Sequence, residues 1–238
     1  MRLDQELVTR GLCRSRTEAQ ELIEQGAVFV NGFQVTKQNK TILPDDRIEV
    51  TSRRKYVSRG GEKLEGALSH VSLNVTDFTV LDVGSSTGGF VDCLLKGGAT
   101  KVVAVDVGSE QLDSTLRSDG RVELHEKTDI RQFATEQLFD LIVGDVSFIS
   151  LSHIVPPLAK LSHTGTLVLF LIKPQFEVGK GNTKKGIVRD ESLYDAVLEH
   201  VRTAFVQGGF EVLDIFPSSI QGGDGNKEFF IYARKGNE

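Results

Sequence analysis

The sequence predicts an α/β fold, in which helices cover both faces of a mainly parallel sheet, preceded by a small α+β unit. Three observations support this. Short apolar runs alternate with helix-periodic segments from about residue 79 to residue 234. A glycine-rich loop follows the first of these runs directly, and an Asn31-Gly32 turn separates two short apolar runs near the N-terminus. The 238 residues suffice for one large core and a small accessory unit.

The first 50 residues are predicted to form the small unit. We expect a helix over residues 3–10 ended by Gly11, a second helix opened by the capping box Ser15-Arg-Thr-Glu18 and stopped by Gly26, a hairpin of residues 27–30 and 33–35, and a last strand over residues 47–50. We therefore assign residues 1–52 to this unit.

A basic segment follows, and residues 53–62 are assigned to an interdomain linker. Tyr56 and Val57 are too apolar for a pure spacer, so they are expected to pack on one domain. Gly60-Gly61 is expected to interrupt the chain just before a helix over about residues 62–69. Residues 63–238 then form the second domain.

The second domain is predicted to alternate strand and helix. Strands are expected near 79–83, 101–106, 121–124, 140–145 and 166–172, helices near 89–97, 110–117, 151–161 and 191–207, and a final antiparallel pair near 211–216 and 228–234.

The loop in Leu81-Asp-Val-Gly-Ser-Ser-Thr-Gly-Gly-Phe90 indicates which cofactor the sheet holds. A carboxylate at Asp82, two residues before Gly84, would repel a dinucleotide pyrophosphate but suits a cation. S-adenosylmethionine carries a sulfonium and an ammonium group. Asp106, at the end of the next strand, can accept hydrogen bonds from ribose hydroxyls. The alternative is that the loop is only a turn.

Polar residues also stand at strand ends where a sheet should be apolar. Asp145 and Lys173 each end a strand, and Glu228 opens the last one. The carboxyl ends of the strands in an open α/β sheet are where ligands bind, so the first two can reach a substrate. The alternative is an ion pair that closes the sheet edge.

The net charge of −5 is distributed unevenly. Residues 1–55 hold ten Lys/Arg and eight Asp/Glu, whereas the remainder holds 18 and 25. Arg10, Arg14 and Arg16 lie around the start of the second helix, where they can meet phosphate, or else form a solvated face.

The longest apolar run, residues 167–172, is far shorter than the roughly 20 residues of a membrane span. The start of the sequence has no signal-peptide pattern, and Cys13 and Cys93 lack metal-ligand spacing. We therefore expect a cytoplasmic protein with no membrane and no metal.

The front segment is similar to the S4 RNA-binding domain, through its Ser-Arg, Ala, Leu-Ile and Gly-x-Val-x-Val-Asn-Gly pattern. Lys63, Asp145, Lys173 and Glu228 match in order and context the Lys-Asp-Lys-Glu tetrad of FtsJ-like RNA 2′-O-methyltransferases. With the stretches of residues 58–64, 144–150 and 172–179, the whole chain resembles the TlyA family, some of whose members carry an older haemolysin label.

This resemblance implies a Rossmann-like class I methyltransferase that uses S-adenosylmethionine to methylate cytidine 2′-hydroxyls in small- or large-subunit ribosomal RNA. Lys173 is the candidate base, neutralised in part by desolvation and by the like charge of Lys63. Asp145 and Glu228 orient the lysines, and Asp145 can also face the sulfonium. The strand end Asp145-Val-Ser-Phe148 lacks the prolines of enzymes that methylate exocyclic base nitrogens.

The site residues follow. The cofactor set is Asp82, Gly84, Ser85, Ser86, Gly88, Gly89, Phe90, Asp106, Val107, Asp129, Ile130 and Asp145, and the RNA-binding set is Arg10, Arg14, Arg16, Arg53, Arg54, Lys55 and Arg59. The chain departs from the family after Asp106, where it reads Val-Gly-Ser-Glu110 instead of Gly-Tyr-Gly.

Two other classes of function predict different sequence features. A cytolysin predicts an export signal and an amphipathic membrane segment, and neither pattern is found. A ribosome assembly factor would bind RNA and cofactor without catalysis, which the intact set of Lys63, Asp145, Lys173 and Glu228 argues against. The modified nucleotide, the choice between naked RNA and an assembled subunit, and the oligomeric state stay open.

Overall fold

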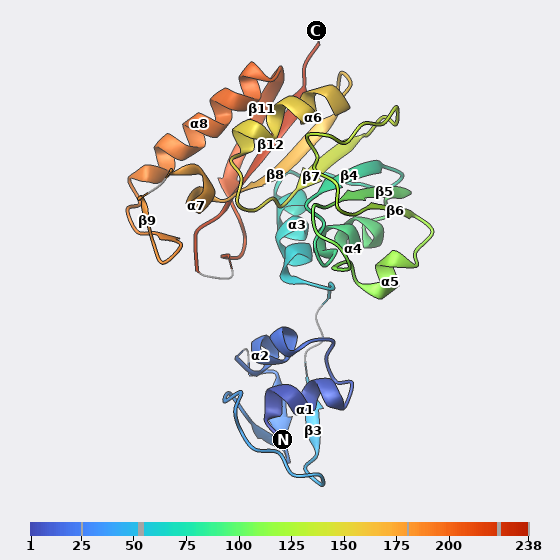
Figure 1. The fold of residues 1–238 in the computed structure, drawn as a ribbon, viewed down its shortest axis with the longest axis vertical. Coiled ribbons are helices and arrows are strands. Elements are labelled where there is room, and N and C mark those ends of the chain that lie inside the picture. The colour runs from blue at the N-terminus through green and yellow to red at the C-terminus, as the bar shows by residue number, and fades with distance from the viewer. Residues whose placement is uncertain (25, 52–54, 180, 223–224, 238) are drawn as a thin grey trace. The chain divides into compact units, whose positions relative to one another are not determined.

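The computed structural model divides the chain into two compact units, Met1–Arg54 and Lys55–Glu238. The structure describes residues 1–24, 26–51, 55–179, 181–222 and 225–237. Figure 1 labels most of the helices and strands.

The first unit pairs two helices with a three-stranded antiparallel sheet of order β2-β1-β3. Its elements are α1 (Leu3–Thr9), α2 (Arg16–Glu24), β1 (Val28–Val30), β2 (Phe33–Gln34) and β3 (Ile48–Val50). Asn31 and Gly32 both have positive φ, 53° and 81°, as the predicted type I′ turn requires. Leu3, Leu7 and Ile23 are fully buried between the helices and the sheet.

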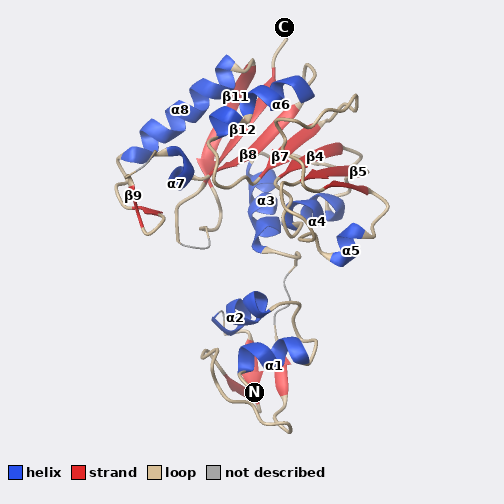
Figure 2. Ribbon diagram, in the orientation of Figure 1, coloured by secondary structure: helices blue, strands red, loops and turns tan. Residues whose placement is uncertain are grey.

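The second unit is built on one seven-stranded sheet of order β11-β12-β8-β7-β4-β5-β6 (Figure 2). Five strands are parallel, and β12 runs antiparallel to both of its neighbours. The strands are β4 (Thr79–Val83), β5 (Lys101–Val105), β6 (Val122–His125), β7 (Leu141–Gly144), β8 (Leu167–Ile172), β11 (Phe210–Pro217) and β12 (Phe229–Lys235). The predicted α/β class and the antiparallel final pair are confirmed.

Helices bury both faces of this sheet. On one face α3 (Arg59–His70) and α4 (Gly89–Lys96) pack Leu64 and Leu94 against the strands. On the other face α6 (Val155–Leu161) and α8 (Leu193–Gln207) pack Leu158 and Phe205. Short elements complete the unit: α5 (Ser114–Arg117), η1 (Leu151–His153), α7 (Pro174–Glu177), β9 (Thr183–Lys184) and β10 (Ile187–Val188).

The segment assigned to the linker belongs to the second unit from Lys55 onward. Tyr56 is buried, and the Val57 amide donates to Asp92 at 2.9 Å. Gly60 and Gly61 do not interrupt the chain, because they lie within the first turn of α3. A Cβ on Gly61 would stand 2.3 Å from the Tyr56 ring, so this glycine lets the ring pack on the helix.

Three expected helices differ from the structure. The α3 helix begins at Arg59 rather than near residue 62. The helix expected over residues 110–117 is only α5, capped by Asp113, whose carboxylate accepts from the Thr115 amide at 2.9 Å. The helix expected over residues 151–161 is divided into η1 and α6. The elements α7, β9 and β10 were not expected.

Candidate active site

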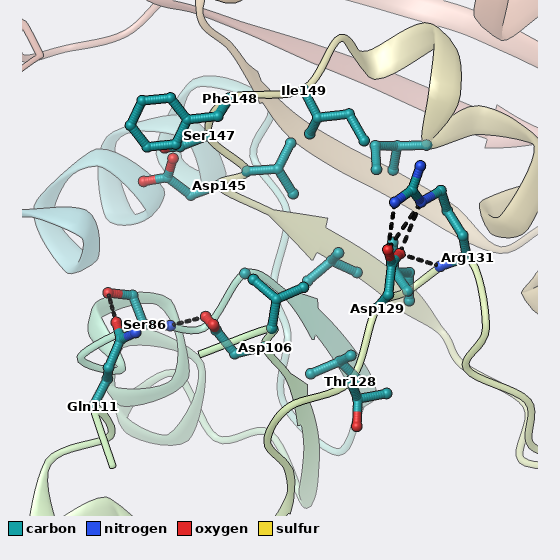
Figure 3. A pocket seen from close by; sticks show the side chains of 17 residues that line it. Ser86, Asp106, Gln111, Thr128, Asp129, Arg131, Asp145, Ser147, Phe148 and Ile149 are labelled. Atoms are coloured by element: carbon teal, nitrogen blue, oxygen red, sulfur yellow. Dashed lines mark hydrogen bonds and ion pairs between the residues drawn. The ribbon is translucent and has the colours of Figure 1, made fainter. Parts of the chain in front are cut away.

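The site lies at the carboxyl edge of the parallel strands. The chain continues from β4 to one side, through β5 and β6, and then returns to the other side through β7 and β8. This reversal leaves a crevice beyond the end of β4, which is where ligands bind in open α/β sheets. A pocket of about 520 Å³ opens there, lined mainly by residues that follow β4, β5, β6 and β7 (Figure 3).

The pocket has an acidic and an apolar part. Asp106, Asp129 and Asp145 contribute carboxylates to its lining. The apolar lining comes from residues on the loops after β5, β6 and β7, which are Val107, Ile130, Val146, Phe148, Ile149 and Ile154. An apolar cleft with a few placed polar groups suits a ligand that joins a flat aromatic ring to a charged chain.

The glycine-rich loop is tied to the acid of the next strand. The amides of Ser86 and Gly108 each donate to the Asp106 carboxylate at 2.7 Å. Gly84 has φ 83°, and a Cβ there would lie 2.9 Å from the Asp145 carbonyl oxygen. Gly84 therefore allows the loop to run close to the end of β7. Each Asp106 oxygen keeps lone-pair capacity, so Asp106 can still accept ribose hydroxyls.

Asp82 is the most deeply buried carboxylate of this edge. It is fully buried, and neither oxygen has a hydrogen-bond partner among the described residues. Burial, together with the charges of Asp145 and Asp106, raises the pKa of Asp82 well above its ordinary value. Two cations also lie near this edge: Arg131, which lines the pocket, pairs with Asp129, and Lys173 pairs with Asp145. Asp82 and Asp106 have no cationic partner among the described residues, so they are the acids that fit a cationic ligand such as S-adenosylmethionine.

A smaller pocket of about 170 Å³ adjoins the first one. The two share Gly84, Ser86, Asp145 and Ser147 in their linings, and the smaller pocket adds Lys173. Its other lining residues come from the start of α3 and the loop before α4, namely Ser58, Gly60, Ser85, Thr87, Gly89 and Phe90. Lys173 thus lines a pocket that adjoins the larger one at Asp145 and Ser147.

The four candidate catalytic residues form two ion pairs. Lys63 Nζ lies 2.5 Å from Glu228 Oε2, and both side chains are buried, at 9% and 3% exposed. Lys173 Nζ lies 2.5 Å from Asp145 Oδ1, with side chains 13% and 23% exposed. Lys173 also donates to Ser147 Oγ at 2.7 Å. The second pair is thus the more open one, and it lines the pockets.

The structure brings most of the expected cofactor residues together. Those that line one or both pockets are Gly84, Ser85, Ser86, Gly89, Phe90, Asp106, Val107, Asp129, Ile130 and Asp145. Asp82 and Gly88 lie behind the lining. Gly88 has φ 94° and caps α4, and a Cβ there would meet Leu112 and Leu116.

Several of the expected RNA-binding cations instead have partners inside their own unit. Arg10 donates to the carbonyls of Leu43, Pro44 and Asp46 and pairs with Glu6. Arg16 pairs at 2.8 Å with Asp4, whose pKa is held below its usual range first by the Arg2 guanidinium. At least some of the N–H groups of these two arginines are therefore used in contacts within the first unit.

Other residues of the expected RNA-binding set also interact within the chain. Lys55 forms an ion pair with Glu65, and Arg59 donates to the Gln221 carbonyl at 2.7 Å. Arg14 also has an interaction within the chain. Arg53 and Arg54 lie outside the described residues.

Two residues at the pocket mouth were not among the expected site residues. Ser147 holds Lys173, and Phe148 is 90% exposed with φ 65°. The Phe148 ring centroid lies 5.0 Å from that of Phe176 in α7. Both residues fall in the stretch 144–150 that marks the family resemblance, so the signal was present in the sequence. A bulky residue at positive φ is strained and is often functional.

Within the described residues, no helix is long and apolar enough to cross a membrane. The same residues contain no group of three or more His, Cys, Asp or Glu side chains placed to hold a metal ion.

Comparison with known families matches both parts of the chain. The FtsJ-like methyltransferase family matches residues 56–235, and the S4 domain matches residues 1–48. The 16S/23S rRNA (cytidine-2′-O)-methyltransferase TlyA of Mycobacterium tuberculosis is 40% identical, over 98% of this chain and 89% of its own length. Hemolysin A of Brachyspira hyodysenteriae is 41% identical, over 98% of this chain and 99% of its own length.

Solved structures show the same similarity. A hemolysin-named protein from Streptococcus thermophilus is 40% identical, covers 100% of this chain and 89% of its own, and has a TM-score of 0.80. A protein from Listeria monocytogenes that is named as an S-adenosylmethionine-dependent methyltransferase has a TM-score of 0.57. It is 14% identical, over 74% of this chain and 98% of its own, so this likeness shows the fold alone. The chain therefore belongs to the FtsJ-like methyltransferase family and, within it, to the TlyA proteins that carry an S4 domain.

Proposed function

We propose that this protein transfers a methyl group from S-adenosylmethionine to the 2′-hydroxyl of a cytidine in ribosomal RNA. The observation that carries the proposal is the position of Lys173, which pairs with Asp145 and lines a pocket that shares Asp145 and three other lining residues with the larger one. The names of relatives such as the TlyA proteins of Mycobacterium tuberculosis and Campylobacter jejuni support the choice of RNA and nucleotide.

The larger pocket would hold the cofactor. Asp106 would accept the ribose hydroxyls, and the apolar residues around Ile130 would contact the adenine ring. Asp82, which is buried without a hydrogen-bond partner among the described residues, and the carboxylate of Asp145 would favour the cationic end, because a bound cation stabilises the ionised form of a neighbouring carboxyl group. When bound, S-adenosylmethionine supplies the methyl group as an electrophilic carbon on a positively charged sulfur.

Lys173 would act on the RNA. A ribose hydroxyl is a weak nucleophile, so its proton must leave as the oxygen attacks the methyl carbon. As the base, Lys173 Nζ would take that proton while the O2′–C bond forms and the methyl–sulfur bond breaks, and the electron pair of that bond would leave with the sulfur as a neutral thioether. Asp145 and Ser147 keep Nζ in place, because each lies within 2.7 Å of it. The rest of the acceleration comes from holding the reacting atoms in line.

The second pair supports this arrangement from α3 and β12. Glu228 precedes Phe229, which is paired with Ile172, and Lys173 follows Ile172 directly. The buried Lys63–Glu228 pair therefore fixes the strand end that carries Lys173. The S4 unit would add RNA affinity through its arginines, with Arg14 and Arg16 at the start of α2.

Transfer of labelled methyl from S-adenosylmethionine to protein-free ribosomal RNA and to each ribosomal subunit tests the proposal. We expect incorporation that maps to a 2′-O-methylcytidine. The matched variant is Lys173→Arg, which keeps a cation beside Asp145 but cannot act as a base. Label on a base, or full transfer by Lys173→Arg, would contradict the proposed chemistry.

A further inference from the structure

A short hairpin next to the site carries positive charge that the proposed function does not use. Residues 183–189, here called the basic hairpin, contain Lys184, Lys185 and Arg189 and no acidic residue. The remainder of residues 56–238 holds 15 basic and 25 acidic residues. Three cations are therefore concentrated in one short hairpin of an acidic domain.

These cations face solvent. Lys184, Lys185 and Arg189 are exposed, and in the described part of the chain their side chains have no hydrogen-bond or ion-pair partner. This distinguishes them from Arg10, Arg16, Lys55 and Arg59, which have partners within their own units.

The hairpin is hydrogen-bonded to the segment that leads into β12. The Asn226 side chain is buried, accepts from the Val188 amide at 3.1 Å and donates to the Gly186 carbonyl at 3.0 Å. Asn226 lies two residues before Glu228. The basic hairpin is thus held at the sheet edge where Lys173 stands, and Figure 1 shows its first strand, β9, beside α7.

The turn of the hairpin places a lysine at conformational cost. Lys184 pairs with Ile187, so the two-residue turn is Lys185-Gly186, and both residues have positive φ, 53° and 77°. Such a type I′ turn favours asparagine or glycine at its first position. A lysine at this position makes the turn less stable than an asparagine would, but it places a positive charge at the tip of the hairpin.

We propose that the basic hairpin is a second RNA-contacting surface, in which Lys184, Lys185 and Arg189 bind phosphates of the RNA whose ribose enters the site. The inference rests on the proposed function. Phosphate contacts position RNA without reading its sequence, and Asn226 would transmit that position to the strand end at Glu228. The RNA would then be held on both units, by the S4 arginines and by this hairpin.

The decisive variant is Lys185→Asn, because asparagine suits the turn better than lysine and cannot harm the hairpin. We measure RNA affinity at several salt concentrations for the full chain, with protein-free ribosomal RNA. The slope of log affinity against log salt should flatten by about 0.7 to 0.9, and Lys184→Gln/Lys185→Asn/Arg189→Gln should flatten it by about 2 to 3. KM for RNA should rise while kcat and cofactor affinity stay unchanged.

Two controls make the outcome specific. Lys185→Arg should keep the wild-type slope, and so should Lys160→Gln, an equal loss of charge near the end of α6, which leads to the opposite edge of the sheet. Unchanged slopes in the triple variant would overturn the inference. So would weaker binding to ribosomal subunits with unchanged binding to protein-free RNA, which would assign the hairpin to a ribosomal protein. A wild-type protein that neither binds nor methylates RNA would instead refute the proposed function.

Discussion

The carboxylates at the active edge of the sheet fall into two groups. Asp145 and Glu228 each have a lysine at 2.5 Å, whereas Asp82 and Asp106 have none. Among the described residues, the Asp106 carboxylate accepts only from backbone amides, and the Asp82 carboxyl group has no hydrogen-bond partner. In the proposed function, the paired acids position lysines for the RNA, and the unpaired acids are left to interact with a cationic cofactor. The comparison assigns substrate and cofactor to different acids of one site.

The two ion pairs differ in how far they are exposed to solvent. The Lys173–Asp145 pair lines the pockets, while Lys63–Glu228 is closed between α3 and β12. Breaking a buried ion pair lowers the folding stability strongly, because removing one partner leaves the other charge buried and unpaired. We therefore expect chemistry at the open pair and conformational support at the closed pair.

The largest effect is expected at Lys173. Lys173→Ala removes the proposed base, so transfer should fall by roughly 10²- to 10⁴-fold. Cofactor affinity, measured by calorimetry, should stay near the wild-type value because the lysine acts on the RNA hydroxyl. If this variant keeps more than about a tenth of the wild-type turnover, the base lies elsewhere.

Lys63→Ala should cost folding stability as well as activity. Glu228 would be left buried and unpaired, which typically costs about 3 to 5 kcal/mol. Denaturant unfolding, followed by a signal from the second unit, measures this loss. Lys63→Met/Glu228→Gln removes both charges and should recover most of the stability without restoring transfer. Equal losses for the single and the double variant would show that packing, not the pair, is responsible.

Asp106→Ala addresses the unpaired group. Loss of charge-assisted bonds to ribose should weaken S-adenosylmethionine binding by about 1.5 to 3 kcal/mol, or roughly 10- to 150-fold. Asp106 also accepts from the Ser86 and Gly108 amides, so Asp106→Asn is the milder companion variant. Asp119→Ala, at a partly exposed pair with Arg121 outside the pocket lining, is the control. Unchanged affinity in folded Asp106→Ala would remove Asp106 from the cofactor site.

The sequence predicted the sheet well because its strands are buried on both faces. The run of β4, for example, was expected over residues 79–83 and is found over Thr79–Val83. The helix expected over residues 110–117 was wrong for a local reason. Leu112 and Leu116 have helical spacing and are both buried, but Glu110 adopts φ 58° and Asp113 caps a helix that begins only at Ser114.

The pairing of charges could not be predicted from sequence. Lys63 and Glu228 are 165 residues apart, so only the folded chain shows which lysine meets which acid. The same limit applies to Arg10, where the spacing indicated a phosphate-binding cation. In the fold, its guanidinium donates to the carbonyls of a loop more than 30 residues away.

The smallest and most diagnostic effect concerns Asp82. In the folded protein the pKa of Asp82 is raised well above 3.8, so the folded state keeps this proton at pH values where the unfolded chain has lost it. Stability therefore falls as pH rises from the unfolded toward the folded pKa. Asp82→Asn does not titrate, so without ligand its Tm should exceed that of the wild type at neutral pH. The difference should shrink as pH falls toward about 4.

Cofactor should reverse this order. Ligand stabilises a protein according to its affinity. A bound cation favours the ionised form of Asp82, whereas the asparagine of the variant cannot ionise. Saturating S-adenosylmethionine should therefore raise the wild-type Tm more than that of Asp82→Asn, whereas S-adenosylhomocysteine, which has no sulfonium charge, should raise the two more nearly equally. Parallel pH profiles from 4 to 8, with equal shifts for both ligands, would show that Asp82 supports the glycine loop only by its shape. The division between paired and unpaired acids would then rest on Asp106 alone.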